Sequence, residues 1–153
     1  MSAWRPVAGI TALRRQVDRR FPRRDRRSDG VIGDKAHQKR GTSDHLPDKR
    51  GFVHAVDIDA DLLGPNGGAA GRQLAEGLAN QLRLYAKSRI PGSERLKYIV
   101  WNNRIASGSY KDQVWTWRKG NWGHEHHVHV SFTTKGENDP NDFPIPILLD
   151  PKS

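Results

Sequence analysis

Cysteine is absent from the 153-residue chain. Disulfide bridges, thiolate metal sites and cysteine nucleophiles are therefore excluded, and any metal site has to be built from His, Asp and Glu. Long apolar runs are also absent, because no stretch approaches the ~20 residues that a transmembrane helix requires. The N-terminal stretch through Gln16 lacks the apolar core of a secretory signal. We therefore expect a soluble protein that is synthesised in a cytoplasm without a signal peptide.

Basic residues outnumber acidic ones, with 26 Lys and Arg against 17 Asp and Glu, a net charge of +9 and a pI of about 10.3. Residues 1–30 hold nine Arg and three Asp, which gives +6 of this excess. Such a segment predicts contact with an anionic partner, and nucleic acid, anionic lipid and the acidic polymers of a bacterial wall all qualify. A solvated arginine-rich helix face is the alternative.

Apolar periodicity and β-branched runs predict an α+β fold. Apolar residues three and four apart indicate helices over 8–20 and 70–88. Strands are expected over 52–59, 96–101 and 126–132, with short strands within 104–122 and a polar loop over 22–44. Trp115 and Trp117 are expected to form core or cleft walls, with stacking on sugar as the alternative. We expect a single domain over 1–153 with a small, mainly antiparallel sheet, two or three flanking helices and a Pro-rich tail over 138–153 that wraps or frays.

A first cluster of polar residues combines Ser43-Asp44-His45 with the run from His54 to Asp59. Side chains alternate between the two faces of a strand, so Asp57 and Asp59 share one face while Val56 and Ile58 point into the core. Carboxylates on an otherwise apolar strand are costly unless a cation meets them. Either aspartate could serve as a metal ligand.

A second cluster places four His within residues 124–129. Alternation sets His127, His129 and Ser131 on one face and Val128 on the other, with the core. Three ligands from the two clusters, together with a water, would satisfy catalytic zinc. A hydrogen-bonded histidine network without metal is the alternative.

Two motifs resemble those of known zinc peptidases. Ser43-x-His45 followed by Gly51 and Ala55-Val56-Asp57 resembles the signature of the D-alanyl-D-alanine carboxypeptidase and dipeptidase family, with a longer loop between His45 and Asp57. The run His127-Val128-His129 resembles the His-x-His of the wider group that includes lysostaphin-type enzymes and hedgehog domains. Residues 28–61 also look like the opening of peptidase domains in endolysins of phages that infect actinobacteria. The resemblance covers roughly 28–132 and implies a zinc site formed by His45, Asp57 and His129.

The resemblance also suggests catalytic roles. Carboxypeptidase-like members carry Glu or Asp three residues before the last His ligand, where this chain has His126. Penicillin-insensitive murein endopeptidases carry His two and five residues before it, and His127 and His124 match that pattern. The general base is therefore His127 by preference, with Glu125 and His126 open. We expect Arg40 to hold a substrate carboxylate.

The function expected from these features is zinc-dependent hydrolysis of bacterial peptidoglycan peptides, as in a phage endolysin that is made in the host cytoplasm and acts on the cell wall. The bond could be L-Ala–D-Glu, a D-Ala cross-link or a terminal D-Ala-D-Ala. We expect a monomer whose basic surface is drawn to the anionic wall. One alternative is a non-catalytic zinc domain that binds the wall or a protein. A metal-dependent nuclease is less favoured, because only Asp44-His45-Leu46-Pro47 resembles a His-Asn-His nuclease and the second half of that signature has no match.

Overall fold

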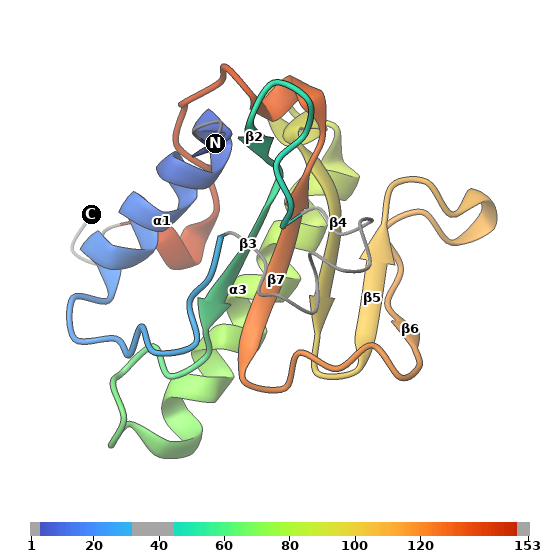
Figure 1. Cartoon of the computed structure of the whole chain (residues 1–153). Coiled ribbons are helices and arrows are strands. Elements are labelled where there is room, and N and C mark those ends of the chain that lie inside the picture. Colours follow the sequence, from blue (N-terminus) through green and yellow to red (C-terminus); the bar gives the residue numbers. More distant parts are fainter. Residues whose placement is uncertain (1–3, 32–44, 150–153) are drawn as a thin grey trace.

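A five-stranded antiparallel sheet forms the centre of the protein, seen in a computed structural model that describes residues 4–31 and 45–149 (Figure 1). In spatial order its strands are β3 (Ala55–Asp59), β7 (His127–Phe132), β4 (Leu96–Trp101), β5 (Arg104–Ser107) and β6 (Arg118–Lys119). A separate parallel pair joins β1 (Arg5–Pro6) to β2 (Phe52–Val53). The strand predicted over 52–59 is thus divided at His54, because its first part pairs with β1 and its second part pairs with β7.

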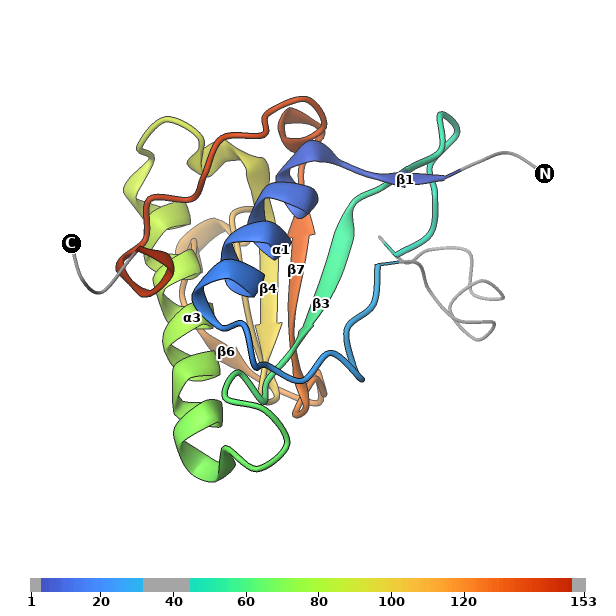
Figure 2. The ribbon, with the colours of Figure 1, turned by 90° about the vertical axis from the view of Figure 1, so that its left-hand side faces the viewer.

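Two α-helices in the described part of the chain, α1 (Ala8–Arg20) and α3 (Gly68–Ser88), lie on the same side of the sheet (Figure 2). Short 3₁₀ helices connect or follow the strands: η1 (Ser93–Arg95), η2 (Lys111–Gln113), η3 (Thr134–Gly136) and η4 (Pro146–Leu148). This arrangement confirms the predicted α+β fold with a small antiparallel sheet and flanking helices. No helix in the described ranges has both the length and the apolar character needed to cross a bilayer.

The hydrophobic core lies between the helices and the sheet. The predicted apolar stripe of α1, from Val7 to Phe21, is buried, as are Val56 and Ile58 of β3 and the alternate residues of β7 that begin at Val128. In α3 the apolar residues expected to face the core are Ala70, Leu74, Leu78, Leu82 and Tyr85. They are buried from Leu78 onward, whereas Leu74 is half-buried and Ala70, in the first turn, is exposed. Because side chains alternate along a strand, the remaining side chains of β3 and β7 point to the other face of the sheet, away from the helices. The polar clusters lie on that face.

The arginine-rich N-terminal region is largely paired with carboxylates of the same chain. The buried guanidinium of Arg24 donates to Asp18 at 2.8 Å and to both oxygens of Asp29, at 2.9 and 2.6 Å. Asp29 also accepts the backbone N–H of Asp59 at 2.7 Å, so this ion pair holds residues 24–29 against the end of β3. Further arginines that contact an aspartate are Arg14, Arg15, Arg19, Arg26 and Arg27.

The C-terminal segment wraps over the helices as far as the structure describes it. Phe143, Ile145 and Leu148 are buried, and the Gln16 side chain of α1 clamps the backbone of Phe143. The Gln16 amide donates to the Phe143 carbonyl at 3.1 Å and accepts the Phe143 N–H at 2.7 Å. The predicted tail is therefore a packed wrap over 138–149 rather than a frayed end.

We predict that Gln16→Ala lowers the free energy of unfolding by about 2 kcal/mol, because it leaves a buried N–H and a buried C=O without partners. Urea denaturation followed by circular dichroism would measure the change. Gln73→Ala, at an exposed position of α3, is the matched control and should shift stability by less than about 0.5 kcal/mol. Equal effects from both variants would show that the clamp contributes nothing.

Candidate metal centre

The site is organised by a cross-strand pair between β3 and β7. Asp57 lies directly opposite His129 in the register of the two strands. Side chains that face each other across an antiparallel pair lie close enough to interact, and here His129 Nδ1 is 3.0 Å from Asp57 Oδ1. The register of the sheet therefore brings together residues from the two polar clusters.

His45 completes a group of three possible ligands. Its Nε2 atom lies 3.2 Å from Asp57 Oδ2 and 3.2 Å from His129 Nδ1. Ligands placed about 2.0–2.1 Å from a tetrahedral zinc ion are roughly 3.3 Å from one another, so the observed separations fit a shared ion. The buried His45, Asp57 and His129 group could hold a metal ion.

The ring nitrogens that point away from this group are also held in place. His45 Nδ1 lies 2.8 Å from the carbonyl oxygen of Val31, and His129 Nε2 lies 2.7 Å from the Ser131 hydroxyl. A carbonyl can only accept, so His45 Nδ1 donates, and the Nε2 atom, which faces Asp57 and His129, would present its lone pair to a bound cation. Such outer contacts fix the tautomer and orientation of metal-binding imidazoles. Ser131 lies on the face that strand alternation predicts, but no sequence pattern indicates its contact with His129.

The Asp57 carboxylate is charged in this environment. Burial alone would raise its pKa, but hydrogen bonding to His129 and His45 outweighs burial and holds the pKa well below its usual range. The Asp57 backbone is fixed as well, because its N–H donates to Gly30 and its carbonyl accepts from Gly30. The group therefore offers one anionic ligand on β3 and two imidazole ligands, one on β7 and one in the loop before β2.

Asp59, the alternative ligand, has a different task. Its carboxylate accepts the backbone N–H of Ser28 at 3.0 Å and of Asp61 at 2.8 Å. It also lies with Asp61 and Asp25 in a separate acidic group. Of the two aspartates, Asp57 is the one that the structure brings to His45 and His129.

Two further histidines, His124 and His127, approach the same carboxylate. His127 Nε2 lies 3.4 Å from Asp57 Oδ2, and His124 Nδ1 lies 3.7 Å from Asp57 Oδ1. Burial and the neighbouring positive charge of His129 lower the pKa of His124 to about 4. His127 thus lies beside the group as expected for a candidate base, and His124 joins it.

The loop that carries His124 is fixed by the β4–β5 turn. His124 has a left-handed backbone with φ 57°, and its carbonyl accepts the N–H of Asn102 at 2.9 Å. The Asn103 side chain accepts from the N–H of Gly123 at 2.9 Å and donates to Glu125 Oε1 at 2.8 Å. A conformation that few non-glycine residues adopt is thus held by hydrogen bonds to both asparagines of the turn.

The other candidates lie elsewhere. The Glu125 carboxylate is directed to Asn103, and the His126 side chain is exposed. Neither belongs to the described groups that could hold a metal with Asp57. Arg40, the expected carboxylate-binding residue, lies outside the described residues.

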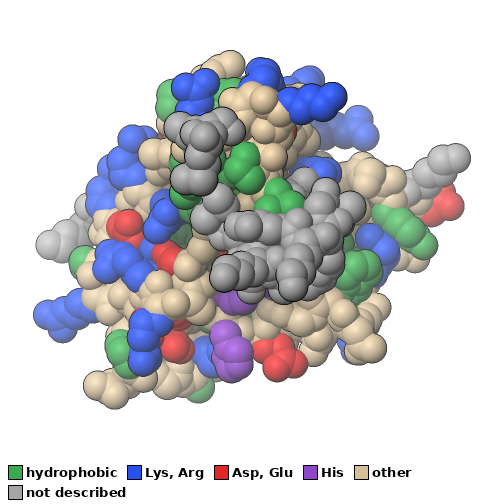
Figure 3. Space-filling model, viewed as in Figure 1, with side chains coloured by type: hydrophobic (Ala, Val, Ile, Leu, Met, Phe, Trp, Pro, Cys, Tyr) green, Lys and Arg blue, Asp and Glu red, His purple; other side chains and the backbone are tan. Residues whose placement is uncertain are grey.

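Tyr98 of β4 forms one wall of the group, which the sequence did not indicate. Its ring stacks on that of His129, with the centroids 5.2 Å apart and an interplanar angle of 14°. Histidine side chains are visible on the sheet face turned away from the helices, where this group lies (Figure 3). The site is therefore on the side of the sheet opposite the hydrophobic core.

A polar clamp closes the loop that follows His45. His54 Nε2 lies 3.1 Å from Asp48 Oδ2 and 3.4 Å from Glu137 Oε2, while Arg50 donates to Glu137. Asp48 also accepts the backbone N–H groups of Arg50 and Phe52. These contacts form an ion-pair network that ties residues 48–54 to the segment after β7.

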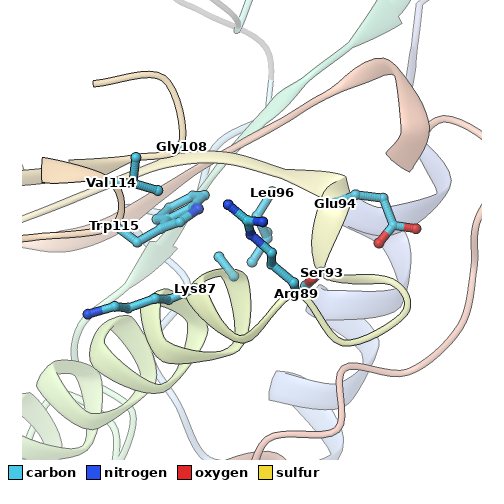
Figure 4. Close-up of a pocket in the computed structure, with 9 residues that line it drawn as sticks. Lys87, Arg89, Ser93, Glu94, Leu96, Gly108, Val114 and Trp115 are labelled. Carbon is cyan, nitrogen blue, oxygen red and sulfur yellow. The ribbon is translucent and has the colours of Figure 1, made fainter. Parts of the chain in front are cut away.

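A cavity of about 580 Å³ lies apart from the His group, at the C-terminal end of α3 (Figure 4). Lys87, Arg89, Glu94 and Trp115 are among its lining residues. Trp115 is buried and serves as both core residue and cavity wall, in agreement with its predicted role. None of the lining residues belongs to the candidate metal centre.

Comparison of the chain with protein-family models, curated proteins and solved structures gives no match.

We predict that Ser131→Ala weakens Zn²⁺ binding about tenfold, because the outward nitrogen of His129 loses its partner. Competition with a chromophoric chelator would measure the dissociation constant. Ser107→Ala removes another buried serine of the same sheet, from β5, and should leave affinity unchanged. Unaltered affinity in Ser131→Ala would mean that the Ser131 contact does not support the ligand.

Proposed function

We propose that this chain is a zinc-dependent peptidase that hydrolyses an amide bond in the peptide stem or cross-link of bacterial peptidoglycan. The observation that carries the proposal is the geometry of His45, Asp57 and His129, whose facing atoms are 3.0–3.2 Å apart. The fixed outer nitrogens of both histidines support it, because catalytic zinc sites orient their ligands in this way. The same three residues match the ligands implied by the resemblance to D-alanyl-D-alanine carboxypeptidases and dipeptidases.

The chemistry required is activation of a water and of a scissile carbonyl. Zinc supplies both effects when bound, since it polarises the carbonyl and makes a water molecule nucleophilic near neutral pH. His127 accepts the proton of the attacking water and returns it to the leaving amine. Its ring suits this role because it lies 3.4 Å from Asp57 and is a quarter exposed, so that substrate can reach it. Asp57 stays ionised and balances positive charge at the site.

The substrate class follows from the resemblance and from charge. Endolysin peptidase domains act on peptidoglycan, whose surroundings in the wall are anionic. A net charge of +9 favours approach to such a polymer, and this long-range attraction weakens as salt rises. We infer that the protein is an endolysin made in the host cytoplasm and released onto the wall. Internal pairing of many N-terminal arginines means that the attraction comes from net charge more than from one free patch.

The direct test is metal content and muralytic activity on one preparation. We expect at least one zinc per chain, and chelator-sensitive release of new amino termini from purified peptidoglycan. Mass spectrometry of the fragments would identify the bond that is cut. Zinc without cleavage would favour a non-catalytic binding domain, and a protein without tightly bound metal would refute the proposal.

Substitutions separate the metal ligands from the base. We predict that His129→Ala abolishes tight zinc binding and activity, whereas His127→Ala retains zinc and loses at least 100-fold in kcat. His126→Ala is the matched control, because this neighbouring side chain is exposed and should be dispensable. Normal turnover in His127→Ala would exclude it as the base, and loss of turnover in His126→Ala alone would transfer that role to His126.

A further inference from the structure

Asp57 belongs to two groups of possible metal ligands. Besides the group with His45 and His129, its carboxylate forms a second group with His124 and His127, whose ligand atoms all lie within 4.8 Å of one another. The rings of these two histidines meet edge to face, with centroids 4.6 Å apart. Four imidazoles therefore surround a single carboxylate.

One catalytic zinc ion cannot use all these ligands. Such an ion takes three protein ligands and keeps one position for water or substrate, and His45, Asp57 and His129 already supply three. His124 and His127 remain. The nitrogen that His124 directs at Asp57, Nδ1, is buried without a hydrogen-bond partner among the described residues, whereas His127 approaches Asp57 with Nε2. A buried polar atom without a partner is uncommon in a native protein and often marks the place of an ion or a water.

The Asp57 carboxylate is suited to serve two cations. Oδ1 lies 3.0 Å from His129 and 3.7 Å from His124, while Oδ2 lies 3.2 Å from His45 and 3.4 Å from His127. Each oxygen is thus within reach of both groups, and an ionised carboxylate has about four acceptor positions. Two-metal sites in proteins place their ions about 3.5–4 Å apart, a separation that a carboxylate can span.

We propose that Asp57, His124 and His127 form a second, weaker site for a divalent transition-metal ion such as Zn²⁺. The second ion binds less tightly because it shares the carboxylate with the first ion and is repelled by it. Its ligands are also more exposed than His45 and His129. Imidazole and carboxylate ligands suit zinc, whereas a hard cation such as Mg²⁺ prefers oxygen ligands alone.

Occupation of this site has a regulatory consequence, which rests on the proposed function. His127 Nε2, the nitrogen that faces Asp57, cannot accept a proton while it binds an ion. The first equivalent of zinc therefore activates the peptidase, and the second equivalent inhibits it.

The binding experiment is a titration of the metal-free full chain with Zn²⁺ by calorimetry, with bound zinc measured after equilibrium dialysis. We expect two equivalents, the second at least tenfold weaker than the first. His124→Asn should bind one equivalent with the affinity of the first site. Asparagine is chosen because it tolerates the left-handed backbone of residue 124 and removes the imidazole. Retention of the first equivalent also shows that the variant folds.

His127→Gln should lose the same equivalent as His124→Asn, while His126→Asn, the matched control, should retain both. Saturation of the wild type at one equivalent would overturn the second site. So would two equivalents in His124→Asn, which would direct attention to the group formed by Asp48, His54 and Glu137. A single equivalent that is weakened by His124→Asn would mean that all five residues hold one ion, which also overturns the inference.

Activity on peptidoglycan provides the second readout. The wild type should gain activity up to one equivalent of zinc and then lose it as the second equivalent binds, whereas the residual activity of His124→Asn should rise without falling. Hydrolysis with no inhibition at two bound equivalents would refute the regulatory inference and leave the peptidase intact. Two equivalents with one lost in His124→Asn, but no hydrolysis, would refute the peptidase while supporting the second cation site.

Discussion

The largely buried carboxylate of Asp57 is the constraint on which the polar face of the sheet depends. Burial of an isolated carboxylate is costly unless hydrogen bonds or cations compensate for the lost water. His129, directly opposite on β7, and His45, from the loop before β2, provide those contacts within 3.2 Å. Because the pKa of Asp57 is held low, its carboxylate stays negatively charged. Four histidines lie close to this carboxylate. A divalent cation bound beside this carboxylate would add further compensating positive charge.

The hydrophobic face of the sheet and its edges make this arrangement rigid. Val56 and Ile58 anchor β3 in the core beneath the helices, so Asp57 between them has little freedom. The segment before the site is held by the buried ion pair of Arg24 with Asp29, which also fixes the end of β3. Catalytic and binding groups require this kind of support, because small displacements weaken both metal binding and proton transfer. The arginines thus contribute to the architecture of the site as well as to net charge.

The histidines divide into a more buried pair and a more exposed pair. His45 and His129 are buried, and their outward nitrogens are fixed by a backbone carbonyl and by Ser131. His124 and His127 are half-buried and approach Asp57 from the loop before β7 and the start of that strand. The first pair is placed as the ligands of a tightly bound ion would be. In the roles proposed above, the second pair would exchange protons or bind a cation more weakly, and these two uses of the same nitrogen exclude each other.

Local sequence patterns were sufficient to predict the main helices and strands and the possible metal ligands. Helices over 8–20 and near 70–88, and the strand over 96–101, followed from local periodicity, because alternation and 3.6-residue repeats depend on neighbours in the chain. The absence of cysteine restricted the ligands to His, Asp and Glu. The family resemblance favoured Asp57 and pointed to His124, but only the folded chain shows that Asp57 meets the histidines while Asp59 caps backbone N–H groups. It also shows that His124 joins the site while Glu125 binds Asn103. It also supplied Ser131 and Tyr98. These contacts depend on the register between β3 and β7. The paired residues Asp57 and His129 are 72 positions apart in the chain, so no local pattern encodes that register.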